Sequence, residues 1–127
     1  MTPERAMEPY GSVIAQHFRR PRNQGALPNA SASAEGVNPL CGDRVRFAVA
    51  LDENGTITEA RFVANACAIC VAAASLLTER VQGVVSTMAR EIADDEMLRI
   101  VGEGVPTARM KCATLPLETL RRALALL

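Results

Sequence analysis

The sequence contains no tryptophan and a single histidine, and phenylalanine and tyrosine make up only 3% of its 127 residues. Acidic and basic residues balance at 14 each, so there is no net charge to attract a polyanion. A protein that binds nucleic acid usually presents a basic surface or aromatic side chains that stack on bases. We therefore expect no nucleic-acid partner.

No apolar run approaches the roughly 20 residues that a membrane-spanning helix requires. The N-terminal segment Met-Thr-Pro-Glu-Arg also lacks the apolar core of a signal peptide. We therefore expect a cytoplasmic protein without a membrane partner. In a reducing cytosol its four cysteines are better explained as metal ligands, nucleophiles or small core residues than as disulfides.

Hydrophobic residues make up 49% of the sequence, enough for a real core in a chain of this length. We therefore expect one domain over residues 1–127. Apolar residues at helical spacing predict a first helix over residues 9–20, which Pro21 ends. His17 lies on this helix and is expected to cap it or pack against it rather than to bind metal.

The middle of the chain has the pattern of β-strands. Alternation of apolar residues with polar or small ones predicts a strand over 44–51 and a returning strand over 56–63. The segment Asp52-Glu53-Asn54-Gly55 between them predicts a hairpin turn, because Asn and Gly both tolerate positive φ. A short edge strand is also predicted over 32–37, within a segment rich in turn-forming residues.

Helices dominate the second half of the chain. A run without proline or glycine predicts a helix over 68–81 that ends before Gly83. Shorter helices are expected over 86–90 and 94–101, the latter capped by Asp94 or Asp95. A leucine stripe predicts a last helix from Ala113 to Leu127. Strands followed by helices indicate an α+β fold, a small antiparallel three-stranded sheet with the helices packed on one face.

Three of the four cysteines lie at boundaries between these predicted elements. Cys41 precedes a strand in a loop bent by proline and glycine, with Asp43 two residues further on. Cys67 is placed at a helix N-terminus, where free amides and the helix dipole stabilise a thiolate, and Cys112 precedes the last helix. Three thiolates and one carboxylate would form a four-ligand site of the kind that zinc prefers, and thiolates also hold iron–sulfur clusters.

The fourth cysteine allows a different interpretation. Cys67-Ala-Ile-Cys70 is the one Cys-x-x-Cys pair in the chain, so the spacing is not that of a zinc finger. At a helix start this pair would suit a thiol-disulfide oxidoreductase, but the βαβ pattern typical of that class is missing from the sequence. Cys70, one turn into an alanine-rich helix, is more simply explained as a packed thiol.

Four short motifs follow one another in the order and spacing of a known family. They are His17-Phe18-Arg19-Arg20-Pro21-Arg22-Asn23-Gln24-Gly25, Asn38-Pro39-Leu40-Cys41-Gly42-Asp43, Ala66-Cys67-Ala68-Ile69 leading to Ala74-Ser75-Leu76-Leu77-Thr78-Glu79, and Arg109-Met110-Lys111-Cys112-Ala113-Thr114-Leu115. In these motifs the chain resembles the iron–sulfur cluster assembly scaffold family of IscU and SufU, which also forms the N-terminal domain of NifU.

The resemblance implies that Cys41, Asp43, Cys67 and Cys112 bind the metal or cluster. It implies a scaffold that accepts sulfur from a cysteine desulfurase, binds iron or a [2Fe–2S] cluster transiently and delivers it to apo-proteins. Such a protein is a sulfur acceptor more than a turnover enzyme, and zinc is expected in its isolated form. Cys41, on a loop, is the better candidate persulfide acceptor, and Cys112 is the second.

The residues around Cys112 bear on the branch of the family. IscU proteins have a histidine before the third cysteine, whereas this chain has Lys111 in an Arg-x-Lys-Cys-Ala-Thr-Leu motif similar to SufU. Lys111 and Arg109 are candidates for electrostatic support of the thiolates. The alternative function is therefore a zinc-bound, SufU-type sulfur-transfer protein that stimulates a cysteine desulfurase, and a purely structural zinc domain is a further one.

The chain also departs from both branches. It lacks the segment that SufU proteins usually carry before the third cysteine, so a SufU-like site is combined with an IscU-like length. Val105-Pro106-Thr107-Ala108-Arg109 stands where IscU proteins have the Leu-Pro-Pro-Val-Lys bound by their dedicated Hsp70 chaperone, so that partnership is not expected. Ala66 replaces the glycine usual before the second cysteine, which implies ordinary backbone angles or a small strain.

Overall fold

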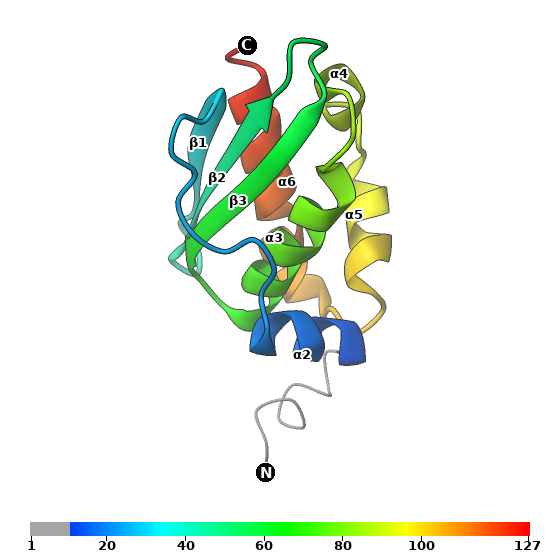
Figure 1. Ribbon diagram of the computed structural model, residues 1–127. Coiled ribbons are helices and arrows are strands. Elements are labelled where there is room, and N and C mark those ends of the chain that lie inside the picture. Colours follow the sequence, from blue (N-terminus) through cyan, green and yellow to red (C-terminus); the bar gives the residue numbers. More distant parts are fainter. Residues whose placement is uncertain (1–10) are drawn as a thin grey trace.

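The centre of the fold is a three-stranded antiparallel sheet in the order β1-β2-β3 (Figure 1). The computed structural model describes residues 11–127. The strands are β1 (Ala32–Asn38), β2 (Asp43–Leu51) and β3 (Ile57–Asn65). In β2 the inward residues Val45, Phe47 and Val49 are fully buried, as the alternating pattern predicts. The predicted edge strand over 32–37 is confirmed and extends one residue further.

The hairpin between β2 and β3 is confirmed, with a longer turn than an Asn-Gly dipeptide would give. Of the two turn residues only Gly55 has a positive φ, 81°. The Asp52 carboxylate instead accepts hydrogen bonds from the amides of Asn54 and Thr56, both at 2.9 Å. A register shift at Ala50 and Leu51 accompanies this turn. The side chain of Asp52 therefore shapes the loop as much as the glycine does.

The helices are α2 (Ser12–Arg19), α3 (Ala68–Val81), α4 (Ser86–Ala89), α5 (Asp94–Val101), the 3-10 turn η2 (Thr107–Arg109) and α6 (Met110–Leu124). Helix α6 lies behind the sheet in Figure 1, α2 lies below it, α4 and α5 lie to its right, and no helix covers the other face of the sheet. The predicted α+β fold, with helices on one face of a small sheet, is confirmed.

The core forms where α3 and α6 pack on the inner sheet face. Helix α3 is buried on nearly all sides, because its small alanines allow α2, α6 and β3 to approach it closely. Gly36 likewise allows β1 and α6 to approach each other closely, since a Cβ atom there would collide with the Oγ1 atom of Thr119 on α6. Helix α6 therefore lies directly against the edge strand.

Several predicted boundaries are wrong. Helix α6 begins at Met110, so Cys112 lies inside its first turn rather than before it, and the helix ends at Leu124, leaving Leu127 exposed. The N-cap of α5 is Ala93, and neither Asp94 nor Asp95 caps it, because both lie in its first turn. In the first turn their negative charges interact favourably with the positive end of the helix dipole.

The part of the first predicted helix before residue 11 lies outside the described residues. Within residues 11–127, none of the helices is both long enough and apolar enough to cross a bilayer.

Candidate metal centre

Three separate element ends bring the predicted site residues to one end of the sheet. Cys41 lies in the turn between β1 and β2, and Asp43 is the first residue of β2. In this turn the Asn38 side chain accepts a hydrogen bond from the Leu40 amide at 3.1 Å, and Gly42 has a φ of 76°. The positive φ at Gly42 reverses the chain between the cysteine and the aspartate.

Cys41, Asp43 and Cys112 form a compact group of metal-ligating atoms. One ligand atom from each residue lies within 4.8 Å of the other two. The Sγ atoms of Cys41 and Cys112 are 3.8 Å apart, which is too long for a disulfide. In a tetrahedral site with zinc–sulfur bonds of about 2.3 Å, two sulfur ligands lie about 3.8 Å apart. The spacing of the two thiols therefore fits a shared metal ion.

Asp43 is buried, with only 4% of its surface exposed. Its Oδ1 atom accepts a hydrogen bond from the Cys67 amide at 2.9 Å, while its buried Oδ2 atom has no hydrogen-bond partner among residues 11–127. Burial raises the pKa of Asp43, but the Cys67 amide and the neighbouring thiols outweigh it and hold that pKa below its ordinary value. Asp43 is therefore a charged, buried carboxylate with one oxygen free for a cation.

Cys67 is the N-cap residue of α3, as the sequence predicts, and its thiol is half-buried. Its sulfur is not part of the compact group of three, although its amide holds the Asp43 carboxylate in place. Ala66 before it does not have a positive φ, so the replacement of glycine brings ordinary backbone angles here. The structure thus assembles three of the four expected ligands tightly and places the fourth at their margin.

Cys112 lies in the first turn of α6 and is 2% exposed. Burial, and then its contact with the Asp43 carboxylate, raise the pKa of the Cys112 thiol. Pro116 in the same helix has no amide hydrogen, so the Cys112 carbonyl lacks its usual helical donor. Without a cation this thiol stays protonated, and a bound metal would be what deprotonates it.

The two candidate basic residues differ in where they lie. Arg109 is fully exposed, and hydrogen bonding to the Cys112 thiol, followed by the charge of Cys67, raises the pKa of its guanidinium. Lys111 instead lines a polar groove with Asp94 and Glu118, on another side of α6. Arg109 is therefore the cation that lies over the thiols.

Cys70 lies apart from this group, on α3 and inside the hydrophobic core. Its side chain has no exposed surface, and burial raises the pKa of its thiol. A protonated, inaccessible thiol cannot serve as the partner of Cys67 in disulfide exchange. This geometry counts against the oxidoreductase interpretation of the Cys67 and Cys70 pair.

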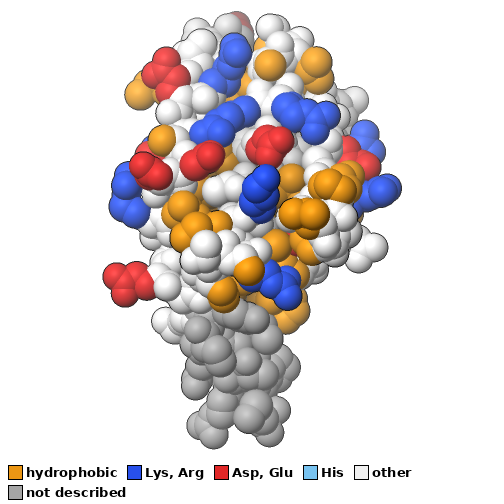
Figure 2. Space-filling view, turned by 180° about the vertical axis from the view of Figure 1, so that it is seen from behind, with side chains coloured by type: hydrophobic (Ala, Val, Ile, Leu, Met, Phe, Trp, Pro, Cys, Tyr) orange, Lys and Arg blue, Asp and Glu red, His pale blue; other side chains and the backbone are white. Residues whose placement is uncertain are grey.

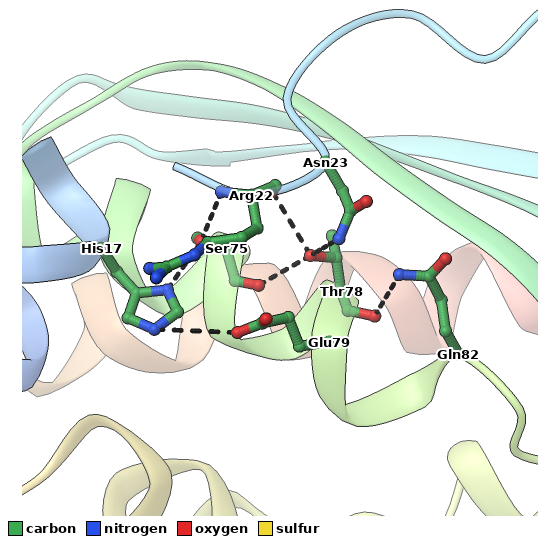
Figure 3. Close-up of polar contacts among 7 residues, drawn as sticks. All are labelled: His17, Arg22, Asn23, Ser75, Thr78, Glu79 and Gln82. Atoms are coloured by element: carbon green, nitrogen blue, oxygen red, sulfur yellow. Dashed lines mark hydrogen bonds and ion pairs between the residues drawn. The ribbon is translucent and has the colours of Figure 1, made fainter. Parts of the chain in front are cut away.

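Sequence reasoning missed a polar network that fixes α2 against α3 (Figure 3). The Ser75 hydroxyl accepts the Arg22 amide at 2.8 Å and lies 2.8 Å from Nδ1 of His17. Nε2 of His17 faces Glu79 at 3.7 Å. Because Ser75 is fully buried, this constellation joins the helices and offers no accessible nucleophile. The expectation that His17 packs the first helix fits this arrangement.

The same network continues along α3. The Asn23 side chain donates to Oγ1 of Thr78 at 3.0 Å, and Gln82 donates to the Thr78 carbonyl (Figure 3). Asn23 has a φ of 60°, a conformation that asparagine tolerates better than most residues. Its position in the first motif was the one signal in the sequence that pointed to this role.

With the geometry in place, comparison with known proteins identifies the family. The family described as NifU-like N terminal domain matches residues 9–126. The chain belongs to this family. A bifunctional protein NifU/MnmA from Rubrobacter xylanophilus is 35% identical to this chain over 91% of the chain's length. The match spans only 24% of that relative, which is much longer.

Other members of the NifU-like family match over most of their length. An iron–sulfur cluster assembly scaffold protein IscU from Aquifex aeolicus is 34% identical, covering 91% of this chain and 73% of the relative. A zinc-dependent sulfurtransferase SufU from Bacillus subtilis is 33% identical, covering 91% of this chain and 89% of the relative. The crystal structure of FiSufU, a SUF-system protein from Fervidobacterium islandicum, matches with a TM-score of 0.77 at 24% identity. The match covers 94% of this chain and 98% of that chain, so the two share a fold.

The lengths of these alignments bear on the two branches of the NifU-like family. The match to the Bacillus SufU runs over 135 positions, whereas the match to the Aquifex IscU runs over 116, for the same share of this chain. The SufU therefore has residues that this chain lacks. This agrees with the expected combination of a SufU-like motif and an IscU-like length.

Proposed function

We propose that this protein is an iron–sulfur cluster assembly scaffold, which accepts sulfur, holds iron or a [2Fe–2S] cluster for a time and passes it to apo-proteins. The observation that carries the proposal is the convergence of the Cys41 and Cys112 thiols on a buried Asp43 oxygen without a partner. Thiolates suit iron and zinc, whereas a carboxylate is a harder ligand that holds cluster iron less firmly. Such a mixed ligand set favours release as well as binding.

Sulfur would come from the persulfide of a cysteine desulfurase. In that step the Cys41 thiolate attacks the terminal sulfur, a new persulfide forms on Cys41, and the desulfurase cysteine leaves as a thiolate. Cys41 is exposed at the turn, whereas Cys112 is buried, so Cys41 is the acceptor that a partner can reach. Cys67, the N-cap residue of α3, whose thiol contacts Asp43 and Cys112, would supply the remaining sulfur ligand.

The proposal includes a cytoplasmic location and general partners, a cysteine desulfurase and apo iron–sulfur proteins. A reducing compartment would keep the four cysteines free to bind metal. The named scaffold and sulfurtransferase relatives support this assignment for the family without naming the partners of this chain.

A second candidate function is zinc-dependent sulfur transfer without cluster assembly. Two observations favour it, namely Lys111 in place of the histidine of IscU proteins and the 33% identity to a zinc-dependent sulfurtransferase SufU. Zinc would hold the thiols as reactive thiolates, and Cys41 would take sulfur while exchanging on the metal.

Anaerobic reconstitution with ferrous iron, cysteine and a cysteine desulfurase distinguishes these functions. The wild type is compared with Cys41→Ser and Cys112→Ser, and Cys70→Ala serves as the matched control because Cys70 lies in the core. We expect visible absorbance, bound iron and sulfide, and transfer to an apo-ferredoxin from the wild type and the control only.

Other results would decide differently. One tightly held zinc, with faster desulfurase turnover and no absorbance, would favour sulfur transfer. A chain that binds neither metal nor sulfur would overturn both functions. Unfolding on chelation would favour a structural zinc domain, whereas the hydrophobic core between the sheet, α3 and α6 predicts that the metal-free chain stays folded.

A further inference from the structure

No helix covers the outer face of the sheet (Figure 1). This face holds a groove of about 450 Å³. The connection between α2 and β1 forms one wall, with Leu27 beside the groove, and the outward side chains of β2 and β3 form its floor. Val63 on this floor is 48% exposed. The groove is therefore open, and part of its floor is apolar.

Three arginines line this groove, namely Arg44 and Arg46 from β2 and Arg61 from β3. The one acidic residue in the lining is Glu35, which lies 3.6 Å from Arg44. Basic charge thus exceeds acidic charge at this place on a chain whose net charge is zero. The opposite side of the molecule differs, because acidic and basic side chains are interspersed there (Figure 2).

The three arginines differ in how far their charge is already compensated. Arg61 is paired with Glu59 at 2.9 Å, and the pair of Arg44 with Glu35 is longer, at 3.6 Å. Arg46 is exposed and has no hydrogen-bond or ion-pair partner among residues 11–127. An open guanidinium of this kind binds carboxylates through two parallel N–H donors.

The spacing of the arginines indicates the shape of the ligand. Arg44 and Arg46 project from one face of a strand two residues apart, a separation of about 7 Å at the strand's rise per residue. An extended peptide with an acidic side chain at every second position repeats at the same distance. The side chains between those carboxylates point to the other side of the peptide backbone, so the acidic side chains alone would face Arg44 and Arg46.

We propose that this groove binds an extended acidic segment of a protein partner, with carboxylates at alternate positions. The segment would lie along β2 with its carboxylates on Arg46 and Arg44, and its intervening side chains would point away from the floor of the groove. Charge complementarity favours an acidic peptide, and exposed, spaced arginines favour a polymer with repeated charges over a single small anion.

The position of the groove relates the binding to the metal centre. Arg44 directly follows Asp43 in β2, and Asn65 at the groove's end precedes Cys67 by two residues. A partner held in the groove would therefore lie near the end of the sheet that carries Cys41 and Asp43. The binding itself depends on neither the metal nor the sulfur chemistry proposed above.

The test uses the complete protein and a short fluorescein-labelled peptide of alternating valine and glutamate, followed by fluorescence anisotropy. We expect saturable binding that weakens as salt is raised, and a loss of at least about tenfold in affinity in Arg46→Glu, since charge reversal replaces attraction by repulsion. Arg90→Glu, a charge reversal on an exposed residue outside the groove, is the matched control and should bind as the wild type does.

Two altered peptides keep the test independent of the variants. A valine–lysine peptide of the same length should not bind, and a peptide with its glutamates in one block should bind less tightly than the alternating one. Cys41→Ser should bind the peptide normally, which separates a failure of the groove from a failure of the metal centre.

Several outcomes would overturn the proposal. They are the absence of saturable binding at low salt, equal binding by Arg46→Glu, loss of binding in Cys41→Ser, and equal affinity for both glutamate arrangements. Competition by citrate at the affinity of the peptide would assign the groove to a small anion instead. Self-association of the wild type that Arg46→Glu abolishes would assign it to a second copy of the chain.

Discussion

The Sγ atoms of Cys41 and Cys112 lie 3.8 Å apart, although 71 positions separate the two residues in the chain. One thiol is exposed at a turn and the other is buried in the first turn of α6. The contact is therefore made by tertiary packing between the sheet and the last helix. It gives the centre an accessible sulfur next to a protected one.

This proximity predicts a selective disulfide in the metal-free protein. Treatment with diamide should join Cys41 to Cys112, because small shifts of the turn bring the two sulfurs to bonding distance. Zinc should slow the reaction by occupying both thiols. Peptide mapping by mass spectrometry identifies the bond, and Cys70→Ala is the control. A bond between Cys67 and Cys70 as the main product would contradict this prediction.

Asp43 is expected to control how fast the proposed cluster leaves. Asp43→Ala should slow transfer to an apo-ferredoxin, because the exchangeable carboxylate is lost. The alanine variant should also lose about 1–2 kcal/mol of folding free energy, since the Cys67 amide loses its acceptor. Asp43→Asn keeps an acceptor oxygen and isolates the effect of charge. Equal transfer rates from matched cluster-loaded proteins would show that Asp43 is not the labile ligand.

Arg109 and Lys111 provide a matched pair of cations near the third thiol. Arg109→Ala should slow alkylation of Cys67 in the metal-free protein by iodoacetamide at mildly alkaline pH, because the positive guanidinium contacts the Cys67 sulfur, the nucleophile of this reaction. Lys111→Ala should change the rate little, because Lys111 lies in the groove with Asp94 and Glu118. The rates are followed residue by residue in mass spectra. An equal or larger effect of Lys111→Ala would reverse this assignment.

Gly36 is predicted to be intolerant of any side chain. A Cβ atom there would lie 3.2 Å from Cδ1 of Leu115 and 3.3 Å from Cβ of Thr119, and it would collide with the Thr119 hydroxyl. Gly36→Ala should therefore cost about 1–3 kcal/mol in denaturant unfolding. Adding Thr119→Ala should recover part of that loss, because it removes the colliding oxygen. A double variant whose losses simply add would place the strain elsewhere.

His17 should make stability depend on pH. Burial and the charge of Arg22 lower the pKa of His17, with Glu79 opposing them. The unfolded chain then takes up a proton below its ordinary pKa of about 6.5 while the folded ring stays neutral. The contribution of His17 to the free energy of unfolding is therefore fully present above about pH 6.5. It is lost as the pH falls below that value, by up to about 1.4 kcal/mol per pH unit.

The pH dependence is measured by urea unfolding of the metal-free protein between about pH 5 and 8, the range in which histidine titrates. His17→Gln should flatten the profile, because an amide can still pair with Ser75 but does not titrate. A slope that persists unchanged in His17→Gln would belong to another group.

Much of the fold follows from local pattern. The strands over β2 and β3 and the helix over α3 are found within two residues of their predicted ends, because alternation and a run without breakers determine these states locally. The start of α6 and the cap of α5 were wrong, because neighbouring elements rather than local sequence decide those ends.

Local sequence likewise predicts some features of the candidate site, whereas tertiary packing decides the others. The motifs alone nominate Cys41, Asp43, Cys67 and Cys112, and local sequence places Cys67 at a helix start. Whether these side chains meet depends on how the β1–β2 turn packs against α6, contacts between residues far apart in the chain. The sequence also places two basic residues, Arg109 and Lys111, near Cys112. It does not show which of them faces the thiols, because that depends on the rotation of α6 about its axis.

What the sequence by itself determined is the family, the order of strands and helices, and the residue types that suit a thiolate and carboxylate centre. Local propensity and short motifs are enough for these. Only the tertiary structure decided that Cys41, Asp43 and Cys112 converge while Cys67 lies at their margin, that Cys70 belongs to the core, and that three arginines share an open groove. Those relations arise from packing across the sheet, and no local pattern in the chain encodes them.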